Sequence, residues 1–172
     1  VCLTGAGCSL ASGIPTYRTE TGDWQGRNPI NHQDFLESFG TRQRYWARSF
    51  MGWPLMNTAQ PNPAHRALKE LVALGKIETL ITQNVDSLHE QAGLTDVQHL
   101  HGDLRQVTCM VCGASEPRTQ LQVRLAKLNT HLELDGEIQP DGDAEIPSEV
   151  IRQFKIAHCL LCRGTLKPNV VF

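Results

Sequence analysis

The sequence has no apolar run long enough to span a bilayer, no internal repeat and no low-complexity tract, and its charges nearly cancel. A spanning helix needs about 20 apolar residues, so no membrane segment is predicted. The formal net charge of −2 gives no electrostatic reason to expect nucleic acid or an anionic membrane as a partner. No signal peptide is visible, and Val1 stands in an apparent strand where Met would begin a chain. We therefore expect that the start has been lost, together with any targeting segment.

The overall composition is that of a soluble globular protein. The chain has 172 residues, of which 40% are hydrophobic and 20% are charged, so it can bury one sizeable core. Its last residues, Val170–Phe172, form an apolar run without a turn or cap after it. We therefore expect the C-terminus to be cut in mid-strand.

The spacing of the cysteines favours a metal site over disulfides. Four of the six form two C-x-x-C pairs, which are Cys109 with Cys112 and Cys159 with Cys162. Each pair can place two thiolates on one tetrahedral Zn²⁺, because a tight turn brings positions i and i+3 together. Four thiolates would close the coordination shell, so the zinc is predicted to be structural.

Glycines support the same interpretation. Gly113 and Gly164 follow the two pairs, as in knuckle turns where the backbone passes close to a metal. The alternative is a set of reduced core cysteines or redox pairs. Cys2 and Cys8 have no partner at metal-binding spacing, and we expect them to be a buried strand residue and a loop residue.

Polar residues concentrate where a predicted strand ends. Leu80–Thr82 is the short apolar, β-branched run of a buried parallel strand, and Gln83, Asn84 and Asp86 follow it. Open α/β sheets bind ligands at this end of their strands. The alternative role for Asn84 and Asp86 is that of a helix N-cap.

The next segments return the chain to the same edge. Residues 86–92 predict a short helix that Gly93 stops, and residues 97–100 predict a strand that delivers His101. His99 lies two residues earlier and would point to the same face of a strand, so periodicity does not choose between the two histidines.

The N-terminal residues predict a strand, a glycine-rich turn and the start of a helix at about Ser12. Gly5 and Gly7 would let a diphosphate approach the backbone N–H groups. The pattern departs from G-x-G-x-x-G because the third glycine, Gly13, comes late. A tight strand-to-helix turn without a ligand is the alternative.

Helices are predicted elsewhere in the chain. Residues 34–39 and 42–50 predict two, residues 121–128 predict another, and the clearest one has Asn62 as its N-cap and Pro63 at its first position. His65 is expected to be structural in that helix, which ends at Gly75. The acidic residues 135–143 predict a solvated loop; a calcium site is the alternative, although the EF-hand pattern is absent.

Five segments, in order, resemble the signature of the sirtuins, which are NAD-dependent protein deacylases. These are Gly5-Ala6-Gly7-Cys8-Ser9, Gly13-Ile14-Pro15-Thr16-Tyr17-Arg18, Thr82-Gln83-Asn84-Val85-Asp86, His101-Gly102 and Lys167-Pro168-Asn169-Val170-Val171-Phe172. Residues 42–48, 52–54 and 61–65 are similar to the class II branch, which includes a mitochondrial sirtuin.

The resemblance implies an α/β fold, a Rossmann-like parallel sheet that is incomplete here, with a small inserted zinc-binding domain and a helical module. Residues 1–103 would form the N-terminal part of the NAD-binding domain, including the helical module at about 26–61. Residues 104–166 would form the zinc-binding domain, and residues 167–172 would start the return strand to the large domain. The family continues beyond this point with residues that hold the adenosine half of NAD, so we expect a partial catalytic domain.

The implied reaction removes an acyl group from lysine and consumes NAD as a co-substrate. The acyl oxygen attacks C1′ of the nicotinamide ribose as nicotinamide leaves, and the products are free lysine, nicotinamide and O-acyl-ADP-ribose. By the resemblance, His101 is the base that activates a ribose hydroxyl, and histidine has the pKa for this task. Asn84 would orient the ribose or a water, and Asp86 would accept a hydrogen bond from the nicotinamide carboxamide.

The resemblance assigns the other site residues as well. The NAD contacts would be Gly5, Ala6, Gly7, Ser9, Ile14, Pro15, Tyr17, Arg18 and Gln83, together with Asn84, Asp86 and His101. The acylated protein lysine would bind by β-augmentation beside Val171 and Phe172. The segment Trp24–Arg27 is the nearest match to the Tyr-x-x-Arg pair of relatives that prefer acidic acyl groups, and it motivates the hypothesis of a longer or branched acyl group over acetyl.

Two other functions stay open at this point. One is protein mono-ADP-ribosyl transfer, which would use the same residues. The other is a truncated, inactive zinc-binding module; an ordinary Rossmann dehydrogenase is more distant, because nothing positions a hydride acceptor. The location would be cytoplasmic in a bacterium and mitochondrial in a eukaryote, and the oligomeric state is open.

Overall fold

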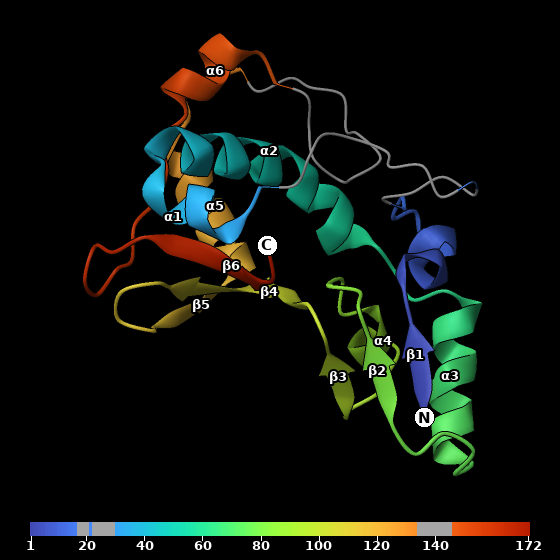
Figure 1. Ribbon diagram of the computed structural model, residues 1–172. Coiled ribbons are helices and arrows are strands. Elements are labelled where there is room, and N and C mark those ends of the chain that lie inside the picture. Colours follow the sequence, from blue (N-terminus) through green and yellow to red (C-terminus); the bar gives the residue numbers. More distant parts are fainter. Residues whose placement is uncertain (17–20, 22–29, 134–145) are drawn as a thin grey trace.

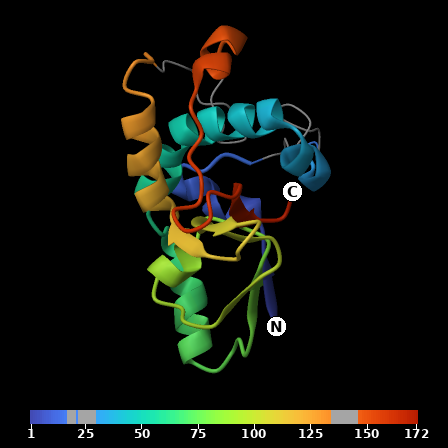
Figure 2. The same ribbon diagram turned by 90° about the vertical axis from the view of Figure 1, so that its left-hand side faces the viewer.

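The computed structural model describes residues 1–16, 21, 30–133 and 146–172, and it contains two sheets (Figure 1). A parallel sheet with one long helix beside it forms the lower part of the molecule, and an antiparallel sheet covered by helices forms the upper part. The view from the side shows the same arrangement, with the parallel sheet below the antiparallel one (Figure 2). No helix among the described residues is long and apolar enough to cross a membrane.

The parallel sheet has the order β1-β2-β3, from β1 (Cys2–Thr4), β2 (Leu80–Thr82) and β3 (Val97–His99). Thr4 pairs with Thr82 and Thr82 with His99, so the carboxyl ends of all three strands are level. The predicted strands are found at these places, but only β2 is largely buried: Cys2 of β1, which was expected to be buried, is partly exposed, and no residue of β3 is fully buried. Because the ends are level, the residues that follow each strand meet at one edge of the sheet.

Helices flank this sheet. The turn after β1 is a 3₁₀ helix, η1 (Ala6–Ser12), which Gly13 ends at a φ of +83°. The helix α3 (Pro63–Ala73) begins as predicted: the Asn62 side chain accepts a hydrogen bond from the Ala64 N–H at 2.9 Å, and Pro63 takes the first position. The short helix α4 (Leu88–Gln91) follows β2 and packs against α3.

The antiparallel sheet has the order β5-β4-β6, from β5 (Ser115–Pro117), β4 (Gly102–Cys109) and β6 (Leu166–Val170). Four helices lie over it, and they are α1 (His32–Glu37), α2 (Phe39–Thr58), α5 (Arg118–Leu128) and α6 (Ser148–Gln153). The residues 167–172, predicted to start the return to the large domain, therefore begin as an edge strand of this second sheet.

The helical module differs from the prediction in its boundaries. The break between its two helices falls at Ser38, whose hydroxyl caps α2 by accepting from the Thr41 N–H at 3.1 Å. The second helix then continues through Pro54, which the sequence would place at a helix end. The hydroxyl of Thr58 donates to the Pro54 carbonyl at 2.8 Å and continues the hydrogen bonding of the last turn.

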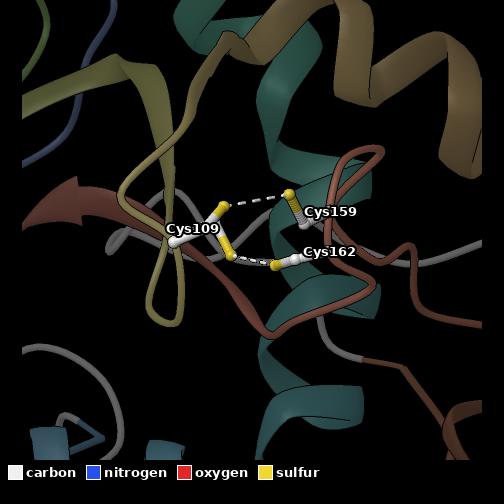
Figure 3. A group of neighbouring side chains, drawn as sticks. Cys109, Cys159 and Cys162 are labelled. Carbon is white, nitrogen blue, oxygen red and sulfur yellow. Dashed lines mark hydrogen bonds between the residues drawn. The ribbon is translucent and has the colours of Figure 1, made fainter.

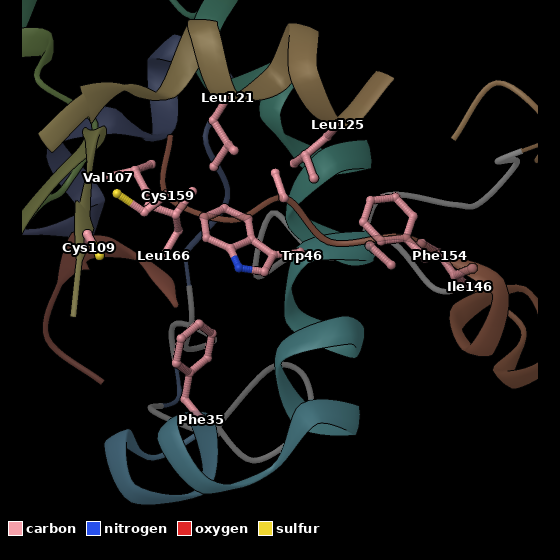
Figure 4. Close-up of a cluster of buried hydrophobic side chains, with 12 residues drawn as sticks. Phe35, Trp46, Val107, Cys109, Leu121, Leu125, Ile146, Phe154, Cys159 and Leu166 are labelled. Carbon is pink, nitrogen blue, oxygen red and sulfur yellow. The ribbon is translucent and has the colours of Figure 1, made fainter. Parts of the chain in front are cut away.

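One hydrophobic core joins the helical module to the second sheet (Figure 4). Its fully buried members include Phe35 and Trp46 from the module and Val107, Leu121 and Leu125 from the sheet and its helix. In the structure the module thus packs mainly with the cysteine-containing part of the chain. The division into residues 1–103 and 104–166 stays a prediction about domains.

A buried arginine strengthens the same contact. Arg118 is 1% exposed, and its guanidinium carbon lies 5.5 Å from the Trp46 ring centre and 4.8 Å from that of Trp53. It also donates to the Ser49 carbonyl at 3.1 Å. Burial lowers the pKa of Arg118 to about 10, so the side chain stays protonated at pH 7 and keeps its cation–π attraction.

Replacing Leu125 by alanine tests the shared core. Leu125 is 0% exposed, so Leu125→Ala should lower the free energy of unfolding of the full-length protein by about 2–5 kcal/mol through the cavity it leaves. Val123, which is 55% exposed on the same helix, provides the control: Val123→Ala should change stability by less than about 0.5 kcal/mol. Urea unfolding followed by circular dichroism measures both, and equal effects would show that α5 is not part of this core.

Candidate functional site

The polar residues predicted as a site meet at the carboxyl edge of the parallel sheet. Residues 5–9 follow β1, residues 83–86 follow β2 and His101 follows β3. Backbone hydrogen bonds continue beyond the strands: the Gln83 N–H donates to the Thr4 carbonyl at 3.1 Å, and the Leu100 N–H donates to the Thr82 carbonyl at 2.8 Å. The loops are therefore held together where they leave the sheet.

A buried hydrogen-bond network joins the first two loops. The Ser9 hydroxyl donates to Asp86 Oδ2 at 2.6 Å, and the Asn84 side-chain amide donates to the Ser9 hydroxyl and to the Gly5 carbonyl, both at 3.0 Å. The other carboxylate oxygen of Asp86 accepts from the Leu88 N–H at 2.9 Å. Asp86 is not the N-cap of α4, because Ser87 takes that position, but its bond to Leu88 holds the chain where α4 begins.

His101 is exposed at this edge and oriented by one hydrogen bond. Its Nδ1 lies 2.9 Å from the Gln83 carbonyl oxygen, which can only accept. Nδ1 therefore carries the ring proton in the neutral imidazole, and Nε2 keeps a lone pair. The Val171 N–H donates to the His101 carbonyl at 2.9 Å, so the segment after β6 runs beside this histidine.

The two candidate histidines lie in different environments. β3 ends at His99, and the half-buried His99 side chain pairs with Glu90 of α4 through Nε2. His101 lies beyond the strand, so the equal orientation expected from strand periodicity does not apply to it. Of the two histidines, His101 is the one whose side chain contacts the loop after β2, through the Gln83 carbonyl.

Gly102 is required because two strands pass very close to each other at this point. In the structure Gly102 has a φ of +85°, and a Cβ at this position would overlap the carbonyl oxygen of Asn169 in β6. The glycine therefore allows β4 to approach β6 closely, and that approach brings residue 171 next to His101.

Only some of the other residues predicted to contact NAD or the substrate lie in the described part of the chain. Ala6, Gly7 and Ser9 lie in η1, and the half-buried Ile14 and Pro15 follow it. Tyr17, Arg18, the segment 24–27 and the acidic residues 135–143 lie outside the described residues. Phe172 packs edge-on against Phe35 and tilted against Tyr45, with ring centres at 5.2 and 5.1 Å, while Val171 is 66% exposed.

Sequence reasoning missed a buried cluster below η1. His89 of α4 is 1% exposed, and its Nε2 lies 2.9 Å from the Thr4 hydroxyl. The rings of His65 and His89 lie 4.9 Å apart, and Cys8 is next to His65. His89 follows Asp86 by three residues, and this helical spacing was the signal that could have placed it near the site.

The four paired cysteines come together in the second sheet (Figure 3). Cys109 Sγ lies 3.5 Å from Cys162 Sγ, and Cys112 Sγ lies 3.7 Å from Cys159 Sγ, so no pair is at disulfide distance. A tetrahedral zinc with Zn–S bonds of about 2.3 Å places its sulfurs about 3.8 Å apart. The cluster therefore has the donors and the dimensions of a structural zinc site.

The two pairs have matching turns. The Gly113 N–H donates to the Cys109 carbonyl and the Arg163 N–H to the Cys159 carbonyl, each at 3.0 Å. Both donor residues have positive φ, so in the second turn this position belongs to Arg163, one residue before the predicted Gly164. Gly164 is needed for another reason, since a Cβ there would press on Val111 and on Cys109 Sγ.

The electrostatics of the first pair also suit a metal. The backbone N–H of Cys112 is the main cause that lowers the pKa of Cys109 to about 6. Cys109 is then a thiolate at neutral pH, which is the form that binds zinc.

Comparison with known proteins gives the family. The Sir2 family model matches residues 5–172. The chain belongs to the Sir2 family. NAD-dependent protein deacetylase 2 of Bradyrhizobium diazoefficiens is 49% identical over 171 residues, which are 99% of this chain and 63% of the relative. The mitochondrial NAD-dependent protein lipoamidase sirtuin-4 of Bos taurus is 46% identical over 174 residues, or 99% of this chain and 55% of the relative.

Solved structures agree with this family. A mutant Sir2 homologue in complex with ADP-ribose has a TM-score of 0.67 at 35% identity, over 100% of this chain and 57% of that one. A Sir2 complex with a p53 peptide and NAD⁺ has a TM-score of 0.70 at 29% identity, over 99% of this chain and 57% of that one. The chain thus spans less than two thirds of the relatives that it matches, and the predicted Rossmann-like α/β fold is confirmed.

Removing one sulfur tests the structural role of the metal. Cys112→Ser should abolish stoichiometric zinc and lower the melting temperature of the full-length protein by about 10 °C or more, because three ligands no longer tie β4 to the turn before β6. Cys2→Ser, which removes a thiol outside the cluster, should leave the zinc content and the melting temperature unchanged. Zinc content by mass spectrometry and thermal unfolding give the answer; a Cys112→Ser protein without zinc but with normal stability would contradict a structural site.

Proposed function

We propose that the protein removes acyl groups from lysine side chains of proteins and consumes NAD, with nicotinamide and O-acyl-ADP-ribose as products. The observation that carries the proposal is the placement of His101. Its Nε2 keeps a lone pair because Nδ1 is bound to the Gln83 carbonyl, and it stands at the edge where three strands end. A base of this kind near neutral pH is what the activation of a ribose hydroxyl requires.

The neighbouring network supports the binding of the co-substrate. We assign the NAD contacts to the turn after β1, with Gly5, Ala6, Gly7 and Ser9, to Ile14 and Pro15, and to Gln83 after β2. A side chain at Gly7 would meet no atom within 4 Å, so a diphosphate has room to approach the backbone there. Tyr17 and Arg18 complete this assignment by sequence alone.

The hydrogen bonds refine two of the roles. Both amide protons of Asn84 are used within the protein, so its remaining Oδ1 is the group that would orient a ribose hydroxyl or a water. Each oxygen of Asp86 accepts one hydrogen bond, and a carboxylate oxygen can accept a second. Asp86 can therefore accept from the nicotinamide carboxamide without losing its contacts to Ser9 and Leu88.

A free strand edge supports the binding of a protein substrate. β6 pairs with β4 on one side, and no described strand pairs with its other side. An extended peptide can add to this edge, and Val171 and Phe172 would then lie nearest to the acyl-lysine. The Cys109, Cys112, Cys159 and Cys162 cluster would hold a structural Zn²⁺ that keeps β4 and β6 in place.

Replacing His101 tests the reaction. His101→Ala in the full-length protein should lower turnover of an acetyl-lysine peptide with NAD by about 100-fold or more, since the general base is lost, while zinc content and melting temperature stay unchanged. His131→Ala, at an exposed position, is the control and should leave turnover as it is. Mass spectrometry of the products follows nicotinamide and O-acyl-ADP-ribose.

The same assay separates the alternatives. A mass increase of one ADP-ribose on protein, without O-acyl-ADP-ribose, would favour mono-ADP-ribosyl transfer. A full-length protein that neither binds nor consumes NAD would favour an inactive zinc-binding module. The proposed location is the cytoplasm for a bacterial source and the mitochondrion for a eukaryotic one.

The acyl group is a second question for the same enzyme. The segment Trp24–Arg27 and the lipoamidase name of one relative support a longer or branched acyl group over acetyl. With acetyl, succinyl, glutaryl and lipoyl peptides of one sequence, kcat/KM should be lowest for acetyl. A clear preference for acetyl, the group named for the bacterial relatives, would contradict this part of the proposal alone.

A further inference from the structure

Three metal-ligating side chains meet below the turn η1, outside the groups assigned to the reaction. Cys8 comes from η1, His65 from α3 and His89 from α4. One ligand atom from each lies within 4.8 Å of the other two, and Cys8 Sγ is 3.9 Å from His65 Nε2. Both histidines are almost fully buried, at 0% and 1% exposed.

One nitrogen of this cluster has no hydrogen-bond partner in the described part of the chain. The Thr4 hydroxyl can donate to the Thr82 hydroxyl at 2.9 Å, and it then accepts from His89 Nε2. His89 Nδ1 consequently holds a lone pair, and this buried atom makes no hydrogen bond among the described residues. A buried acceptor without a partner is unfavourable, and a bound cation would satisfy it.

The charge near the cluster also favours a cation. Asp86 is 6% exposed and acts electrostatically on Cys8, His65 and His89. It accepts hydrogen bonds from two neutral donors, the Ser9 hydroxyl and the Leu88 N–H. Cys2, Arg66, Glu90 and His99 also act electrostatically on members of the cluster, and among them Arg66 is a positive charge that opposes a bound cation.

We propose that Cys8, His65 and His89 form a second metal site, which takes a thiophilic divalent cation such as Zn²⁺ and is distinct from the four-cysteine cluster. Cys8 Sγ, His65 Nε2 and His89 Nδ1 would supply three ligands, and a water would complete a tetrahedral shell. Bonds of about 2.0–2.3 Å require nitrogen–sulfur separations of about 3.6 Å, close to the 3.9 Å between Cys8 and His65.

Metal binding would release one proton and move another within the cluster. The Cys8 thiol releases its proton to solvent when the metal–sulfur bond forms. The neutral His65 ring moves its proton from Nε2 to Nδ1, which gives up the 3.3 Å hydrogen bond from the Asn62 N–H. Burial is the main cause that raises the pKa of Cys8 and lowers the pKa of both histidines, so the imidazoles are neutral at pH 7 while the thiol must ionise.

Occupancy has a consequence that rests on the proposed function. A metal would tie Cys8, in the turn assigned to NAD, to α4 directly after Asp86. It would also place a positive charge beside the carboxylate assigned to the nicotinamide carboxamide. The expected effect is inhibition by micromolar zinc, with a higher KM for NAD.

Cobalt titration of the full-length, zinc-loaded protein tests the site directly. Co²⁺ binds such ligands more weakly than Zn²⁺, so it should leave the four-cysteine cluster intact, and zinc content before and after the titration checks this. The wild type should bind one Co²⁺ with a thiolate-to-cobalt charge-transfer band. Cys8→Ala should lose the band and bind Co²⁺ at least about tenfold more weakly, whereas Cys2→Ala should match the wild type.

The outcomes are separable. A wild type without the charge-transfer band, or a Cys8→Ala protein that keeps it, would overturn the site. His89→Gln, which can still donate to the Thr4 hydroxyl, should also weaken Co²⁺ binding. The melting temperature of Cys8→Ala should equal that of the wild type. Added zinc should inhibit the wild type and spare Cys8→Ala; equal inhibition would overturn the coupling. If the full-length protein has no deacylase activity, the proposed function fails, and the cobalt titration still decides the metal site.

Discussion

The hydrogen bond between the Ser9 hydroxyl and Asp86 joins two loops that are 77 residues apart in the sequence. Both loops leave a parallel sheet at the same level, and Asn84 bridges them again by donating to Ser9 and Gly5. These polar groups are buried, so each lost contact would leave a desolvated donor or acceptor. The arrangement of the glycine-rich turn, and with it the assigned co-substrate site, therefore depends on a carboxylate in the loop that follows the neighbouring strand.

The second sheet reaches the same edge through one close backbone contact. Gly102 begins β4 where β6 passes too near for a side chain, and the residue before it is His101. The cysteine turns at the far end of β4 and just before β6 are held by the four-sulfur cluster. A metal there would fix the pairing of Cys109 with Leu166 at one end of the β4–β6 ladder. The register shifts between Val107 and Asp103, so the bond from the Val171 N–H to the His101 carbonyl belongs to a separately registered part of the same ladder.

The sequence predicted the features that depend on local chemistry. The strands at 80–82 and 97–99, the Asn62 cap with Pro63 and the pairing of the cysteines follow from residue type and spacing, and the structure has them. The continuation of α2 through Pro54 was not predictable from propensity, because packing of Trp46 and Trp53 around Arg118 outweighs the missing N–H. The reason for Gly102 was also hidden, since it lies in a strand 67 residues later, at Asn169.

The candidate site was predictable in its residues but not in their state. The sequence pattern named Asn84, Asp86 and His101, yet only the contacts give the free Nε2 of His101 and the engaged amide of Asn84. The same applies to Cys8, His65 and His89, which lie in three segments with no common motif. They converge because α3 and α4 pack together beneath η1, and one buried nitrogen of His89 has no hydrogen-bond partner among the residues that the structure describes. Asp86 acts on both the polar edge of the sheet and this cluster, so a cation bound below the turn would change the charge at the proposed co-substrate site.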